Sequence, residues 1–169
     1  MASCDEIYIT VKGKGGHGAV PHLALDPVLI ASHIVVALQS VVSRNANPTL
    51  PSVLSIGKFI ANGATNIIPD EVKMEGTFRT FDEQWRAEAH EKIRTICNNI
   101  AVSFGGSCDV LIDVGYPFLK NEETLTGHAF SLAKEYLGVE KVEEMPARMT
   151  AEDFSYYSQV VPACFYRLG

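Results

Sequence analysis

Two segments of the chain alternate between apolar and polar residues, and this pattern constrains the fold more than any other feature. Residues 5–13 contain the run IYITVK, and residues 71–80 read EVKMEGTFRT. Alternation with a period of two places one set of side chains on each face of a sheet. Both segments are therefore predicted to be half-buried strands.

Two helices are predicted from their start signals and their apolar spacing. The first begins at Pro27, follows Asp26 as its N-cap, and runs to about residue 43. Its side chains are apolar around most of its circumference, so it must be covered on more than one side. The second covers about 83–104 behind Asp82, with apolar residues in steps of three and four.

Two further strands complete a known order of elements. One strand-like run, at roughly 52–61, precedes the strand at 71–80, and another, at 108–114, follows the second helix. Residues 5–116 therefore follow the order β-α-β-β-α-β. This order predicts an α+β fold of the ferredoxin-like type, in which two helices cover one face of an antiparallel sheet.

Residues 117–169 do not fit into that unit. They are predicted to form a helix at about 121–137, a short extended piece at 142–146, a helix at 151–159 and a strand at 163–168. Two helices and two short strands bury too little apolar surface to stand alone. We therefore expect a partial α/β segment of a second domain whose other strands lie elsewhere in a longer protein.

Composition excludes several classes of protein. The chain has 14 Lys and Arg against 20 Asp and Glu, a net charge of −6, so no basic face is expected for nucleic acid. No window approaches 18 uninterrupted apolar residues, and the N-terminus lacks the apolar stretch of a secretory signal. We therefore expect no membrane span and a cytoplasmic location. Four cysteines without a CxxC motif predict reduced, mostly buried thiols and exclude a zinc ribbon.

A glycine-rich loop follows the first strand. Residues 13–18 spell G-x-G-x-x-G, but a dinucleotide site needs a helix to open at the third glycine, and here Pro21 intervenes. His17 lies inside this loop and His22 lies five residues later. A metal site would need two more ligands at convergent positions, and an exposed loop histidine can equally have no role.

Four other polar residues have both a functional and a structural interpretation. Asn66 lies in a turn-rich connector, where an amide commonly caps the backbone. Arg79 lies on the polar face of its strand, where it can bind an anion or remain solvated. Glu152 and Asp153 follow Thr150 and can open a helix. Three histidines lie on predicted helices with no motif around them and are interpreted as structural or solvated: His33, His90 and His128.

Three segments together resemble the amidohydrolase branch of the co-catalytic metallopeptidases, which includes aminoacylases, hippurate hydrolases and auxin-conjugate hydrolases. They are ITVKGKGGHGAVPH, NGATNIIPDEVKMEGTFRTFD and MTAEDFSYYSQVVPACFYRLG, in this order along the chain. The resemblance covers essentially the whole sequence. It implies a satellite, or dimerisation, domain at 5–116 and a fragment of the catalytic domain at 117–169.

The resemblance also implies a metal-dependent hydrolase of N-acyl amino acids or related amides. Such enzymes bind two divalent metal ions (zinc, manganese or nickel) through ligands that lie mostly before this domain. Segments like Asp-Gly-Cys-Gly-His and Glu-Glu are absent from the sequence. We therefore expect this chain to hold no metal ligand and to hydrolyse nothing by itself.

The same resemblance implies roles for particular residues. The satellite domain forms a homodimer, and His17 reaches the partner's site and stabilises the oxyanion, with flanking glycines that let the backbone approach a substrate. Asn66 is expected to donate to a substrate carbonyl or carboxylate, and Arg79 to bind the carboxylate of the amino-acid half. Glu152 and Asp153 are expected to orient the pocket. The alternative is a stand-alone ferredoxin-like dimerisation or small-molecule-binding module.

Overall fold

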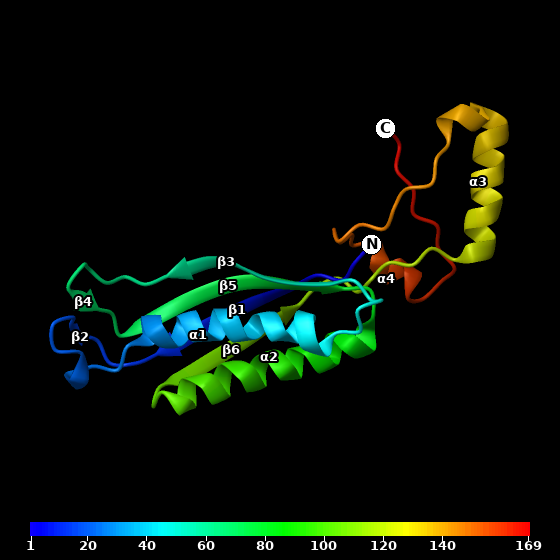
Figure 1. The fold of residues 1–169 in the computed structure, drawn as a ribbon. Helices are drawn as coiled ribbons and strands as arrows, with labels where there is room; N and C mark the ends of the chain where they lie inside the picture. The colour runs from blue at the N-terminus through cyan, green and yellow to red at the C-terminus, as the bar shows by residue number, and fades with distance from the viewer.

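The computed structural model describes residues 1–169, and its main feature is a four-stranded antiparallel sheet (Figure 1). Its strands are β1 (Asp5–Lys12), β3 (Ser52–Ile60), β5 (Glu71–Thr80) and β6 (Ser107–Val114), in the order β3-β5-β1-β6. Each neighbouring pair runs antiparallel. The four predicted strands of residues 5–116 are confirmed.

Two helices run along one face of this sheet, α1 (Pro27–Ser40) and α2 (Glu83–Ser103). The Asp26 carboxylate accepts the N–H of Val28 at 2.8 Å at the start of α1. The Asp82 carboxylate accepts the N–H of Trp85 at 2.7 Å at the start of α2. Both carboxylates satisfy N–H groups that have no partner inside the helix, which is why the helices begin where the sequence predicted.

A single apolar core lies between the sheet and the two helices. The side chains of β1 alternate between buried and exposed along the strand, so only one face of the sheet is covered. The largest fully buried side chains come from β1, β5 and both helices: Ile7, Ile9, Ile30, Ile34, Leu38, Met74, Phe78 and Ile93. Their removal from water is the main force that holds the sheet unit together.

The helix α1 is unusually apolar. Together with the turn that follows it, the segment Pro27–Asn45 is long and apolar enough to cross a membrane by length and composition alone. In the structure this helix packs Ile30, Ile34 and Leu38 into the core under the sheet. The core helix of a globular domain has the same composition, and here the buried side of the helix is part of the core.

A buried ion pair closes the sheet at the end where the chain enters and leaves it. Arg86 Nη2 and Nε lie 2.5 and 3.0 Å from the Asp5 carboxylate, and both residues are buried. His90 Nε2 lies 2.7 Å from the same carboxylate, and the Gly115 N–H donates to it at 3.2 Å. Burial alone would raise the pKa of Asp5, but the hydrogen bonds from His90 and Arg86 outweigh it and hold this pKa below its usual range.

Residues 117–169 lie beyond this closed end of the sheet (Figure 1). They contain α3 (Glu123–Leu137), a short 3₁₀ turn η3 (Val139–Lys141) and the single turn α4 (Ser155–Ser158). The predicted helix at 121–137 is thus confirmed, except at its first two residues. The predicted helix at 151–159 shrinks to four residues.

The strand predicted at 163–168 is wrong, because the structure contains no strand after β6. The short extended piece predicted at 142–146 forms no helix, and the backbone of Val142 is extended. No other strand lies beside residues 163–168 to complete a ladder. The side chain of Asn121 takes over that role, since its Nδ2 donates to the Phe165 carbonyl and its Oδ1 accepts the Phe165 N–H, both at 2.9 Å. Apolar alternation predicts an extended conformation, but a strand also needs a neighbour.

The four cysteines are unpaired, in agreement with the prediction of reduced thiols. The prediction that they are mostly buried is wrong, because only Cys97 is fully buried and the other three are half-buried. Cys97 projects from α2 into the core, and Ile96 packs against that core from a partly buried position.

We expect Arg86→Ala to lower the free energy of unfolding by roughly 3–5 kcal/mol, because it leaves the buried Asp5 carboxylate without its cation. Arg94→Ala is the matched control, since Arg94 pairs with Glu91 on the exposed side of the same helix and should cost about 0–1 kcal/mol. Urea denaturation of both variants measures the difference. Equal losses would show that the Asp5–Arg86 contact does not hold the fold.

Candidate functional site

The far end of the sheet carries a small two-stranded ladder of β2 (Gly16–His17) and β4 (Ile67–Ile68) (Figure 1). His17 pairs with Ile67 in this ladder, and the Gly18 N–H donates to the Asn66 carbonyl at 2.8 Å. The structure therefore brings His17 and Asn66 together, as neighbours on one exposed tip.

The imidazole of His17 is held in one tautomer. Its Nδ1 lies 3.1 Å from the backbone nitrogen of Ala19. A backbone N–H can only donate, so Nδ1 accepts, and the neutral ring carries its proton on Nε2. No residue of the chain accepts a hydrogen bond from Nε2. His17 thus presents a neutral N–H donor to whatever lies beyond the tip.

The glycines around His17 differ in how closely the rest of the chain approaches them. A Cβ at Gly13 would lie 2.2 Å from the Leu25 carbonyl oxygen, and one at Gly15 would lie 2.6 Å from the Ile68 carbonyl oxygen. At these two positions the neighbouring backbone of the chain itself leaves no room for a side chain. Gly18 has no such crowding, since its nearest neighbour would lie at 3.5 Å. The expectation that these glycines admit a substrate therefore does not apply to Gly13 and Gly15.

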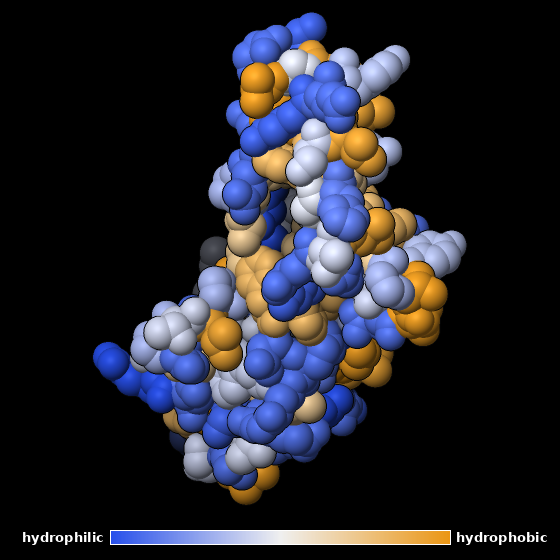
Figure 2. Space-filling model, turned by 90° about the vertical axis from the view of Figure 1, so that its right-hand side faces the viewer, coloured by the Kyte–Doolittle hydropathy of each residue, from blue (hydrophilic) through white to orange (hydrophobic).

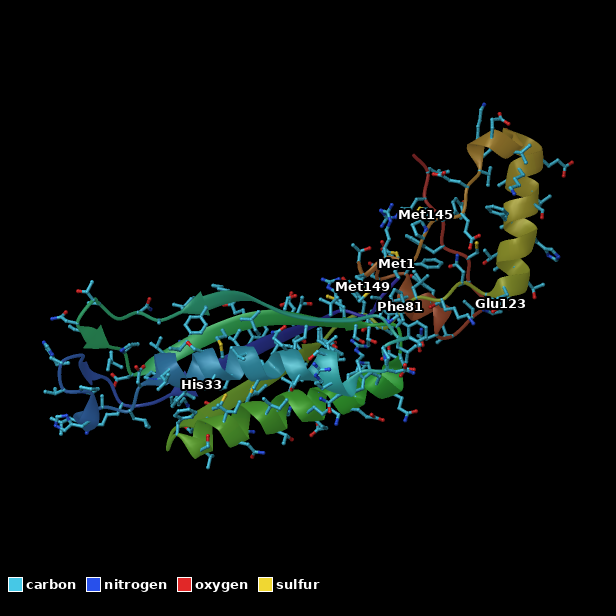
Figure 3. The ribbon with its side chains drawn as sticks, in the orientation of Figure 1. Met1, His33, Phe81, Glu123, Met145 and Met149 are labelled. Carbon is cyan, nitrogen blue, oxygen red and sulfur yellow. The ribbon has the colours of Figure 1, made fainter.

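Arg79 lies at the opposite end of β5, near the junction with residues 117–169. Its guanidinium is half-buried, and Nη1 donates to the Met149 carbonyl at 3.2 Å. Figure 3 shows Met149 and Met1 close together at this junction. Arg79 is therefore tied to the C-terminal segment, and the solvated interpretation of its side chain is wrong.

Glu152 and Asp153 belong to the turn that leads into α4. Their carbonyls accept the N–H groups of Ser155 and Tyr156 at 3.1 and 3.0 Å. Their carboxylates form no hydrogen bond or ion pair within the chain. The helix begins only at Ser155, so the interpretation that Glu152 and Asp153 open a helix is wrong.

The predicted site residues therefore form two separate sets. His17 and Asn66 lie beside one end of β5, whereas Arg79, Glu152 and Asp153 lie at or beyond the other end. The eight steps along β5 from its first residue to Arg79 span about 26 Å at the usual rise of a strand. A single small substrate cannot contact both sets within one chain.

Two open hollows mark the surface, with volumes of about 590 and 630 Å³. The first lies between residues 118–124 and 158–163, and the second lies beside β4. Neither is lined by His17, Asn66 or Arg79. These two hollows therefore provide no pocket for the three candidate residues.

The chain does not present a ligand set for a metal ion. No group of three or more His, Cys, Asp and Glu side chains is placed to hold one. The residues present therefore do not fit the two-metal centre that the sequence resemblance implies for the whole enzyme. No chemical step is assigned here to a metal held by this chain.

Sequence reasoning missed two contributions to this tip. The carboxylate of Asp70 accepts the Gly15 N–H at 2.8 Å, and the Ala19 N–H fixes the ring of His17. The contact from Ala19 is made by its backbone N–H, so its residue type gives no signal for it. Asp70 had a weak signal, because it stands between Pro69 and the alternating strand, where a side chain commonly bonds to nearby backbone.

In this chain, two helices cover one face of an antiparallel sheet, and an exposed histidine lies at the tip beside it. Residues 5–104 match the model of the M20 peptidase dimerisation domain. This match covers more than half of the sequence, so the chain belongs to the M20 peptidase family.

Named relatives agree with this assignment. The chain is 37% identical to the N-acetyl-L-cysteine deacetylase of Bacillus subtilis and 38% identical to the N-acetyldiaminopimelate deacetylase of Bacillus cytotoxicus. Both alignments cover 100% of this chain but only 40% and 45% of the relatives. The chain thus spans less than half the length of these two curated relatives.

A solved structure shows the same fold. The Bacillus subtilis protein YXEP, a dinuclear metal binding peptidase of the M20 family, is similar to this chain with a TM-score of 0.69 and 29% sequence identity. The similarity covers 96% of this chain and 39% of YXEP.

We expect the 169-residue chain to bind no stoichiometric zinc, manganese or nickel in the micromolar range. A structural zinc site normally needs four protein ligands, and the chain does not bring three together. Isothermal titration calorimetry measures this directly. One tight site per chain would contradict the expectation, and loss of that site in His17→Ala and His22→Ala would locate it.

Proposed function

We propose that this chain is the dimerisation region, with part of the catalytic region, of an M20 amidohydrolase that cleaves N-acyl amino acids or related amides. The two deacetylase relatives support the substrate class. The observation that carries the proposal is the imidazole of His17, whose Nε2–H is free and whose Nδ1 is occupied. This geometry suits a donor to a developing negative charge.

The chemistry of amide hydrolysis calls for such a donor. Attack on an amide carbonyl places negative charge on its oxygen, and preorganised N–H groups stabilise that charge. His17 supplies a neutral imidazole N–H, and the side-chain amide of Asn66 on the same tip supplies a second donor. Because Nδ1 already accepts the Ala19 N–H, His17 acts here as a donor and not as a general base.

Arg79 has a separate role in this proposal. One of its N–H groups holds the Met149 carbonyl, and the other N–H groups of the guanidinium can bind the carboxylate of the amino-acid half of a substrate. Glu152 and Asp153, on the turn that follows this contact, orient the pocket around it. A site that uses both Arg79 and His17 must take them from two subunits, because they lie at opposite ends of β5 and the strand from Glu71 to Arg79 alone spans about 26 Å.

The outward side of α1 supports a dimer. Residues 27–43 contain no charged residue, and Leu29, His33 and Val36 on this helix are exposed. Figure 3 shows His33 on α1, well away from residues 117–169. The neighbouring strand β3 is an edge of the sheet with unpaired backbone groups. We assign the dimer interface to α1 and β3, where a second copy would cover an uncharged surface.

Residues 117–169 support the proposal of a longer catalytic unit. Figure 2 faces this end of the molecule and shows apolar side chains spread over it. Exposed apolar residues of this segment include Leu132, Val139, Val160, Val161 and Leu168. Such a surface indicates that further polypeptide packs against it, and it disfavours the alternative of a stand-alone module. The bounds 5–116 and 117–169, the inactivity of the isolated chain and its cytoplasmic location stay predictions.

Val36→Asp should weaken the dimer about 30-fold or more, because it buries an unpaired carboxylate at the proposed interface. Val36 is 74% exposed in the single chain, so the monomer should fold normally. Val102→Asp on α2, a residue 69% exposed, is the matched control and should leave the dimer intact. Sedimentation velocity measures the dimerisation of both variants. Repeating it without residues 117–169 distinguishes dimerisation through α1 and β3 from association through that segment. Equal dimerisation of the two variants would contradict this interface.

In the full-length enzyme, His17→Ala should lower kcat by roughly 10²–10³, the usual loss for one oxyanion donor. Metal content and folding should stay nearly unchanged, because His17 is exposed and not a ligand. His22→Ala, an exposed histidine on the same loop, is the control and should retain kcat. An unchanged kcat in His17→Ala would remove the catalytic role.

A further inference from the structure

The loop that carries His17 is fastened at its two ends and in its middle. The Gly13 N–H donates to the Asp70 carbonyl at 2.9 Å, and the Gly18 N–H donates to the Asn66 carbonyl at 2.8 Å. Between them, the Gly15 N–H donates to the Asp70 carboxylate at 2.8 Å. Asp70 thus binds the loop twice, and its carboxylate is the only side chain outside the loop that bonds to the backbone of residues 13–18.

Close packing makes this contact specific. A Cβ at Gly15 would lie 2.6 Å from the Ile68 carbonyl oxygen and 3.0 Å from the Asp70 carboxylate. Only glycine can bring its amide to this position without displacing the chain. The carboxylate also accepts as a full negative charge, which makes the bond stronger than one between neutral groups.

The regular structure around His17 is small, although an isolated bridge between Lys14 and Leu25 adds two backbone hydrogen bonds of 2.8 Å near the start of the loop. The ladder of β2 and β4 contains two residue pairs, Gly16 with Ile68 and His17 with Ile67. Even a complete two-stranded hairpin is marginally stable in water, and this ladder is far shorter. The bond from Ala19 to His17 Nδ1 forms only while residues 17–19 keep their turn.

We propose that Asp70 is a positioning residue whose carboxylate holds the loop of residues 13–18, and through it the orientation of the His17 Nε2–H. The value of this anchor for catalysis rests on the proposed function, whereas its effect on the loop does not. Asp70 touches no substrate in this account and acts only through the backbone of Gly15.

Amide hydrogen exchange on the 169-residue chain tests the anchor. Asp70→Ala should speed exchange at Gly18 and Ala19 roughly 10-fold or more, although neither amide bonds to Asp70. Asp70→Asn keeps an acceptor oxygen and should restore most of the protection. Glu71→Gln is the matched control, because this neighbouring carboxylate pairs with Lys73 and makes no bond to the loop. Protected core amides such as that of Ile34 should not change in any variant.

Faster exchange at Gly15 alone, with Gly18 and Ala19 unchanged, would overturn the proposal, because Asp70 would then merely satisfy one amide. In the full-length enzyme, Asp70→Ala should lower kcat about 10-fold with KM little changed, and Asp70→Asn should recover it. His17→Ala serves as the reference there. A large loss of kcat in His17→Ala with no loss in Asp70→Ala would contradict only the positioning role of Asp70. No loss of kcat in His17→Ala would contradict the proposed function.

Discussion

The buried contact between Asp5 and Arg86 determines how the whole chain is laid out. It joins the first residue of β1 to α2, and the same carboxylate binds the amide of Gly115 just after β6. The chain therefore enters and leaves the sheet unit side by side, with the Leu119 N–H bonded to the Met1 carbonyl at 2.9 Å. Residues 117–169 bond to the sheet unit at this end, through the backbone of Ala2 and the side chain of Arg79, and the tip at the opposite end is exposed.

That exposed end is where the candidate donor lies. His17 and Asn66 occupy an exposed tip beside the start of β5, and Arg79 lies near the other end of this strand, about 26 Å from its first residue. A single small substrate cannot span this separation within one subunit, but a site formed between two subunits can use both residues. The uncharged face of α1 and the free edge of β3 offer the surface on which two such subunits can associate.

The sequence was sufficient for most of the sheet unit because its signals are local. Alternation in β1 and β5 and the caps Asp26 and Asp82 depend only on neighbouring residues. The buried set of Asp5, Arg86 and His90 could not be predicted, because it joins positions more than 80 residues apart. His90, interpreted as structural or solvated, is structural, since it is buried against Asp5.

The dependence on distant residues also explains the error at residues 163–168 and the errors in the candidate site. The predicted strand at 163–168 had the right residues but no partner strand, and strand pairing is not a local property. The resemblance selected His17, Asn66 and Arg79, but nothing in the sequence gave their separation. The crowding of Gly13 and Gly15 by the chain itself likewise follows from contacts with residues 10 or more positions away.

In the proposed dimer, one active site takes His17 from one subunit and Arg79 from the other. Mixing full-length His17→Ala and Arg79→Ala chains, with subunit exchange verified by mass, tests it most directly. Each variant alone should be strongly impaired, but each mixed dimer would contain one site free of both substitutions. Random mixing in a two-fold dimer should then restore about a quarter of the wild-type activity. No recovery after verified exchange would show that both residues act within the same subunit, which would contradict the account.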